Sequence, residues 1–72
     1  MTDNWTRVID TLIEIRHSKG MTQSDLAQAC GVKRPVITRF EQKNHVPQID
    51  TLTKVASALG CKIKIIVIPD DK

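Results

Sequence analysis

Basic side chains gather in one stretch of this 72-residue chain, between Lys33 and His45. The stretch holds four basic residues and one acidic residue, so its net charge of +3 equals that of the whole chain. Guanidinium and ammonium groups donate hydrogen bonds to phosphate oxygens and to the edges of bases. A basic patch on one element is therefore typical of a surface that binds a polyanion. The alternative is a solvated basic face that binds nothing, and charge alone does not exclude it.

Two short helices are predicted within residues 22–41, joined by a tight turn at Gly31. Thr22 and Asp25 have the spacing of a capping box at the start of the first helix, with Asp in place of the usual Glu or Gln. Gly31 stands where a residue in the left-handed conformation lets the chain leave a helix at low cost. This pair of helices would hold the basic stretch in one orientation.

The second of these helices is expected to begin at one of the two basic residues before Pro35. Proline suits the first turn of a helix, where its missing N–H is not needed. The helix is expected to end near Gln42 or Lys43, and Asn44 can take the left-handed conformation after it.

The two helices are predicted to be amphipathic. Helical spacing assigns these residues to their inward faces: Leu26, Ala27 and Cys30 in the first, and Val36, Ile37, Phe40 and Glu41 in the second. The outward face of the second helix then presents Arg34, Thr38 and Arg39 to a ligand or to solvent.

Two further helices are predicted around this pair, over residues 5–16 and 49–59. The apolar face of the later one comprises Ile49, Leu52, Val55, Ala56 and Leu59. Gly20 and Gly60 follow the two helices as C-terminal signals. Arg16 lies on the apolar stripe of the earlier helix, and a charged group in that position needs a partner.

The last segment, residues 61–68, is rich in β-branched residues and predicts a strand. An isolated strand cannot satisfy its own backbone groups, and each large aliphatic side chain left in water forfeits about 1.5–3 kcal/mol. We therefore expect a homodimer in which two copies of the strand form a two-stranded antiparallel sheet about a two-fold axis. Its dimerisation residues would be Ile63, Ile65, Ile66, Val67 and Ile68. The alternatives are a strand packed on its own helices and a disordered tail.

Several classes of protein are not expected from this sequence. Cys30 and Cys61 form no paired framework, which argues against a secreted disulfide scaffold. His17 and His45 have no triad-like or metal-like spacing, so neither an enzyme nor a metal or other cofactor is expected. No signal peptide is expected, and the longest apolar run, 65–68, is too short to span a bilayer. A cytoplasmic protein without a membrane partner is the default expectation.

The segment from Met21 to Gly60 resembles the lambda-repressor-like helix-turn-helix family, also called the Cro/C1-type or XRE family. The resemblance is carried by these residues: Thr22-Gln23, Leu26-Ala27, Gly31-Val32, Ile37, Phe40-Glu41, Pro47, Leu52, Ala56 and Leu59-Gly60. The segment after Gly60 further resembles small antitoxins of the HipB and HigA kind. The resemblance implies a four-helix domain whose third helix enters the major groove of DNA.

The resemblance also implies a role for particular residues. The family pairs an arginine late in the first helix with a glutamate at the end of the third, here Arg16 and Glu41. It implies a DNA-binding set of Gln23, Lys33, Arg34, Pro35, Thr38, Arg39, Lys43 and Asn44. Within this set, Gln23, Lys43 and Asn44 are expected at phosphates, and Lys33, Arg34 and Arg39 at bases. The family often has glycine where this chain has Lys43.

These expectations combine into one prediction of organisation and function. The chain is expected to be all-α with one C-terminal strand: a helix-turn-helix DNA-binding domain at 1–60, a dimerisation strand at 61–69 and a tail at 70–72. Its function would be that of a dimeric repressor that binds a near-palindromic operator of double-stranded DNA. The alternative is an antitoxin that binds a toxin protein and represses its own operon. In either case it would be a bacterial or phage-derived protein of the cytoplasm, associated with the nucleoid.

Overall fold

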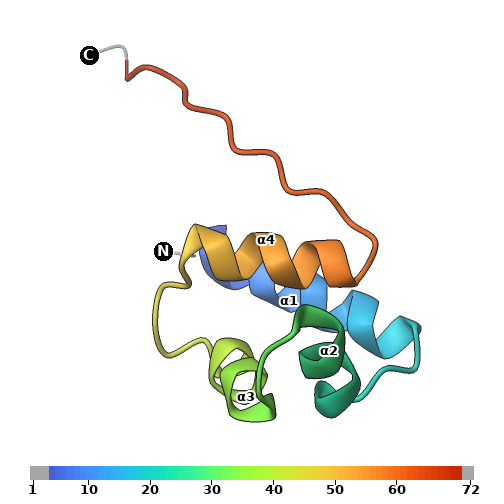
Figure 1. Cartoon of the computed structure of the whole chain (residues 1–72). Coiled ribbons are helices and arrows are strands. Elements are labelled where there is room, and N and C mark those ends of the chain that lie inside the picture. The colour runs from blue at the N-terminus through green and yellow to red at the C-terminus, as the bar shows by residue number, and fades with distance from the viewer. Residues whose placement is uncertain (1–3, 71–72) are drawn as a thin grey trace.

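The computed structural model describes residues 4–70, and within them it has four α-helices and no strand. Their bounds are α1 Asn4–Ser18, α2 Gln23–Cys30, α3 Arg34–Gln42 and α4 Ile49–Ala58. In Figure 1, α2 and α3 lie next to one another below α1 and α4. The all-α prediction is therefore confirmed for the helical part of the chain. Of the predicted tail at 70–72, only the first residue is described.

The helix-turn-helix boundaries follow from local hydrogen bonding. The Asp25 backbone N–H donates to the Thr22 hydroxyl at 3.0 Å, and the Thr22 N–H donates to Asp25 Oδ2 at 2.9 Å. This is the predicted capping box. Gly31 has φ +74°, and Val32 N–H then donates to the carbonyl of Ala27 at 3.0 Å. The turn therefore closes α2 and sends the chain into α3.

The left-handed residue that follows α3 is Lys43, and the prediction that Asn44 takes this conformation is wrong. Lys43 has φ +60° and is the only described residue besides glycine with a positive φ. Its N–H donates to the carbonyl of Phe40 at 3.4 Å. For a residue with a side chain, this left-handed conformation costs about 1–2 kcal/mol. Lys43 therefore occupies a position that glycine would take at lower cost.

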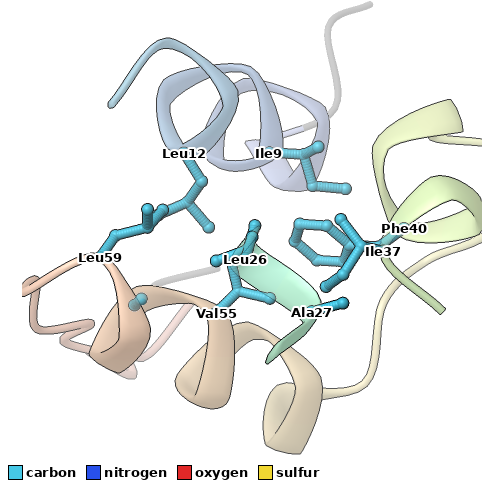
Figure 2. Close-up of a cluster of buried hydrophobic side chains, with 9 residues drawn as sticks. Ile9, Leu12, Leu26, Ala27, Ile37, Phe40, Val55 and Leu59 are labelled. Carbon is cyan, nitrogen blue, oxygen red and sulfur yellow. The ribbon is translucent and has the colours of Figure 1, made fainter. Parts of the chain in front are cut away.

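The core lies where the four helices converge, as Figure 2 shows. The buried hydrophobic residues are Ile9, Leu12, Leu26, Ala27, Ile37, Phe40, Val55, Ala56 and Leu59. Two residues predicted to face inward do not: Val36 is 42% exposed and Ile49 is 60% exposed. On α3 the core contact is made by Ile37 and Phe40, which leaves Val36 to one side of the stripe. Ile49 is the first residue of α4, one turn before that helix reaches the core.

The C-terminal segment does not form the predicted strand. Residues 61–70 carry no regular structure, and in Figure 1 they run away from the end of α4 as an extended trace. Ile63 still packs on the core, but residues 65–68 are 60–87% exposed. A strand needs a second strand to satisfy its N–H and C=O groups, and in the single chain every neighbour is a helix whose bonds are already made. The single chain therefore does not support the strand, and its pairing with a second copy stays a prediction.

No helix in the described residues has the length and apolar character needed to cross a membrane.

Candidate nucleic-acid interface

A buried ion pair links α1 to α3. Arg16 donates from Nε to Glu41 Oε2 at 2.8 Å and from Nη2 to Glu41 Oε1 at 2.9 Å. Its Nη1 donates to the carbonyl of Met21 at 2.7 Å, just before α2. The two side chains are only 8% and 9% exposed. The partner that the resemblance implied for Arg16 is thus the partner it has, and the fork geometry fixes both helices against the start of α2.

Gln23 extends this pair into a network across three helices. Its amide Nε2 donates to Glu41 Oε1 at 3.0 Å, and its Oε1 accepts a hydrogen bond from the Thr38 hydroxyl at 2.9 Å. Both side chains are partly buried. The bond between Thr38 and Gln23 was not predicted, because no local sequence pattern indicates a contact between residues 15 positions apart. The network therefore fastens the first residue of α2 to the middle of α3.

The outer face of α3 is basic and unpaired. Lys33, Arg34, Pro35 and Arg39 are all exposed. The last three, with Thr38 and Gln42, line a shallow open depression. No salt bridge within residues 4–70 involves Lys33, Arg34 or Arg39. Their donors are therefore available to a ligand, and α3 starts with no side-chain cap on its first N–H groups.

Lys43 and Asn44 lie just after α3, but only one of them is free of an acidic partner. Lys43 Nζ forms a salt bridge with Asp10 Oδ1 of α1, while Asn44 is exposed. Asp10 was not part of the predicted site. No sequence signal could have found it, because the two residues are 33 positions apart and Asp10 lies on the polar face of its helix.

An apolar hollow of about 380 Å³ opens beside this face, between α3, the loop after it and the start of α4. Val36, Phe40, Val46 and Pro47 contribute its apolar lining, and His45 lies at the same opening. This is where Val36 goes instead of the core. The sequence did not predict the hollow, because it depends on how the loop folds back over α3.

Burial raises the pKa of the Cys30 thiol, which keeps it protonated and unreactive at neutral pH. Both cysteines are free. Within the part of the chain that the structure describes, no three His, Cys, Asp or Glu side chains gather so as to hold a metal ion.

Comparison with known proteins finds relatives along most of the chain. A sequence profile of the family described as "Helix-turn-helix" matches residues 12–66. The chain is 30% identical over 61 residues, 85% of its length, to Antitoxin HigA1 of Mycobacterium tuberculosis. It is 37% identical over 59 residues, 82% of its length, to an HTH-type transcriptional regulator of Haemophilus influenzae. The chain spans 41% and 60% of the lengths of these two relatives.

A solved structure titled "Toxin-Antitoxin module from Streptococcus pneumoniae" has a similar fold. It superposes with a TM-score of 0.71 at 36% sequence identity, over 88% of this chain and 69% of that one.

Proposed function

The chain belongs to the Cro/C1-type helix-turn-helix family, and from this premise we propose that it is a transcriptional repressor that binds a specific sequence of double-stranded DNA. The observation that carries the proposal is the basic, unpaired face of α3, held rigid from behind by the buried pair of Arg16 and Glu41. A recognition helix must be held that firmly if its side chains are to meet particular base edges.

The base contacts are assigned to α3. In the major groove, Arg34 and Arg39 each donate two hydrogen bonds to O6 and N7 of a guanine, worth about 1–3 kcal/mol of discrimination apiece. Lys33 reaches a base or phosphate at the start of the helix. Pro35 offers only its ring, and Thr38 offers its methyl group to a thymine methyl.

The backbone contacts flank α3 on both sides. Gln23 donates to a phosphate at the start of α2, where the free N–H groups of the helix favour an anion. Lys43 and Asn44 meet the phosphates after α3. To do so, Lys43 either breaks its salt bridge with Asp10 or contacts Asp10 and a phosphate at once. These contacts set the register of the domain on DNA and carry no sequence information.

The functional unit is a homodimer formed through residues 61–69. Two copies of the segment pair antiparallel about a two-fold axis and bury the side chains of Ile63, Ile65, Ile66, Val67 and Ile68. The proposal is supported by the exposure of residues 65–68, which are too apolar to be left in water without cost. A two-fold dimer would place two copies of α3 about 34 Å apart, on successive turns of a near-palindromic operator in the nucleoid of the cytoplasm.

Selection from random double-stranded DNA, followed by gel shifts at moderate salt, tests the proposal. We expect one enriched, near-palindromic sequence. Arg34→Ala and Arg39→Ala should each lose about 1–3 kcal/mol and relax the preference at one guanine. Lys54→Ala is the matched control, because Lys54 is an exposed lysine of α4 that pairs with Asp50. Equal binding of the parent protein to every sequence would reject the proposal.

A second function is favoured by the names of the relatives. One relative is called an antitoxin, and the similar solved structure is titled a toxin–antitoxin module. Under this alternative the chain binds a toxin protein and represses the operon that encodes both. Co-purification from the native host, with identification of the partner and of the adjacent reading frame, separates the two. A small partner protein encoded next to this gene favours the antitoxin, and its absence favours a simple repressor.

A further inference from the structure

The hydrogen bonds that join Thr38, Gln23 and Glu41 assign Thr38 a role that its place on α3 does not reveal. We infer that Thr38 is a positioning residue: its hydroxyl orients the amide of Gln23 so that a remaining amide N–H meets a DNA phosphate. The hydroxyl itself then donates no hydrogen bond to a base. The inference rests on the proposed DNA binding and gives one DNA contact a specific cause.

The charge of Glu41 determines the donor and the acceptor in both hydrogen bonds of Gln23. A carboxylate only accepts hydrogen bonds, so the side of the Gln23 amide that faces it at 3.0 Å must be the NH₂ group. The opposite orientation would set the amide oxygen against an oxygen of Glu41. Glu41 is held in place by the two donors of Arg16. The amide oxygen of Gln23 must therefore face Thr38.

The same logic determines the proton of Thr38. A hydroxyl has one proton, and here it is donated to Gln23 Oε1 at 2.9 Å. Thr38 thus has no proton left to donate to a phosphate or base, and only its methyl group and the two acceptor lone pairs of its oxygen remain. Gln23 has the opposite balance, because Nε2 has two N–H groups and only one goes to Glu41. Gln23 is partly exposed at the first residue of α2, so the second N–H is the group on this network that can reach DNA.

The test uses the full-length protein and the operator obtained by selection. Each phosphate of the operator is replaced in turn by an uncharged methylphosphonate, and binding is measured for the parent, Gln23→Ala, Thr38→Val and Thr38→Ser. Valine has the shape of threonine without the hydroxyl, whereas serine keeps the hydroxyl without the methyl. We expect one phosphate whose replacement lowers the DNA affinity of the parent and of Thr38→Ser about tenfold. The same replacement should leave the DNA affinities of Gln23→Ala and Thr38→Val unchanged.

Two further readouts separate positioning from direct contact. Thr38→Val should weaken binding to all sequences by about the same factor as Gln23→Ala, and the double variant should lose no more than either one. The slope of affinity against salt should stay the same, because Gln23 is neutral and releases no counterion. Thr38→Val should also keep the base preference of the parent.

The inference is overturned if Thr38→Val still responds to that phosphate as the parent does. It is equally overturned if Thr38→Val changes the preference at one base pair and its effect adds to that of Gln23→Ala. Should Thr38→Val fail to fold, the comparison of Gln23→Ala with the parent still decides whether Gln23 has a phosphate partner. Absence of any operator for the parent protein is a different result, which rejects the proposed function itself.

Discussion

Around α2 and α3 the chain supplies a hydrogen-bond partner for each buried polar side chain. Residues 61–70 differ, because most of their backbone N–H and C=O groups are left to the solvent. No buried side-chain nitrogen or oxygen in the described residues lacks a hydrogen-bond partner. Beyond Cys61, by contrast, no described backbone group of the C-terminal segment bonds to the rest of the chain. A helix satisfies its own backbone and needs only an apolar face from its neighbours. An extended segment needs a second one for every bond, so the first region is complete in one chain and the second is not.

The largest expected effect comes from removing the incomplete region. Deleting residues 62–72 should convert the proposed dimer to a monomer, since up to about 1.5–3 kcal/mol per buried aliphatic side chain would be lost. The four helices should keep their helical circular dichroism, because the core lies almost wholly within α1–α4. Mass in solution, by sedimentation or light scattering, measures the change.

Deletion of residues 70–72 alone is the matched control for that experiment. It removes the charged end and keeps the apolar run, so it should leave the mass unchanged. A dimer that persists without residues 62–72 would show that the copies associate elsewhere, and the contrast between the two regions would lose its meaning.

The next effect tests the completed region. Arg16→Ala should destabilise the domain by about 3–5 kcal/mol, which is typical of removing one partner of a buried pair. Glu41, whose side chain is only 9% exposed in the parent, would keep the amide of Gln23 as its one remaining donor. Urea unfolding measures the loss, and a variant that unfolds like the parent would contradict it.

A double variant sharpens the result. Arg16→Met with Glu41→Leu removes both charges and should recover much of the stability lost in Arg16→Ala. It should not recover full DNA affinity, because Gln23 would no longer have Glu41 to orient its amide. Recovery of both properties together would mean that the pair serves stability alone.

The same contrast explains what could be predicted from the sequence. Caps and turns are local, so Thr22 with Asp25 and Gly31 were sufficient to predict the bounds of α2. The Arg16–Glu41 pair joins residues 25 positions apart, and it was foreseen only through the family resemblance. The Lys43–Asp10 pair and the bond from Thr38 to Gln23 were missed, because no local pattern encodes a contact between distant polar residues. The single chain shows no strand in its described residues, because β-branched composition alone cannot supply the second strand that a sheet needs.

A smaller effect is expected at Lys43, where the backbone and the side chain make opposite contributions. Lys43→Gly removes the unfavourable φ of +60° but also loses an exposed ion pair worth about 0–1 kcal/mol and adds freedom to the unfolded chain. We expect stability to change by less than about 1 kcal/mol. DNA affinity should fall, and the slope of log affinity against log salt should drop by about 0.9, as for one lost cation–phosphate contact.

Asp10→Asn is the matched partner of that variant. It frees Lys43 and removes a negative charge, so affinity for DNA should rise while the salt slope keeps its parent value or steepens. An unchanged slope in Lys43→Gly would show that Lys43 binds Asp10 and not a phosphate.

The smallest effect concerns Asp25 and acid. The hydrogen bonds from Thr22, first from its backbone N–H and then from its hydroxyl, lower the pKa of Asp25 below its usual 3.8. A lowered carboxyl pKa adds stability that is present above the unfolded-state value and is lost as pH falls through the folded-state value. Asp25→Asn keeps an oxygen that can accept from Thr22 but cannot titrate. The stability difference between parent and variant should therefore shrink as pH falls below about 4, measured by urea unfolding from pH 6 down to pH 3. A difference that stays constant over this range would mean that the capping box at α2 does not depend on the charge of Asp25, and that the start of the helix-turn-helix is held by Thr22 alone.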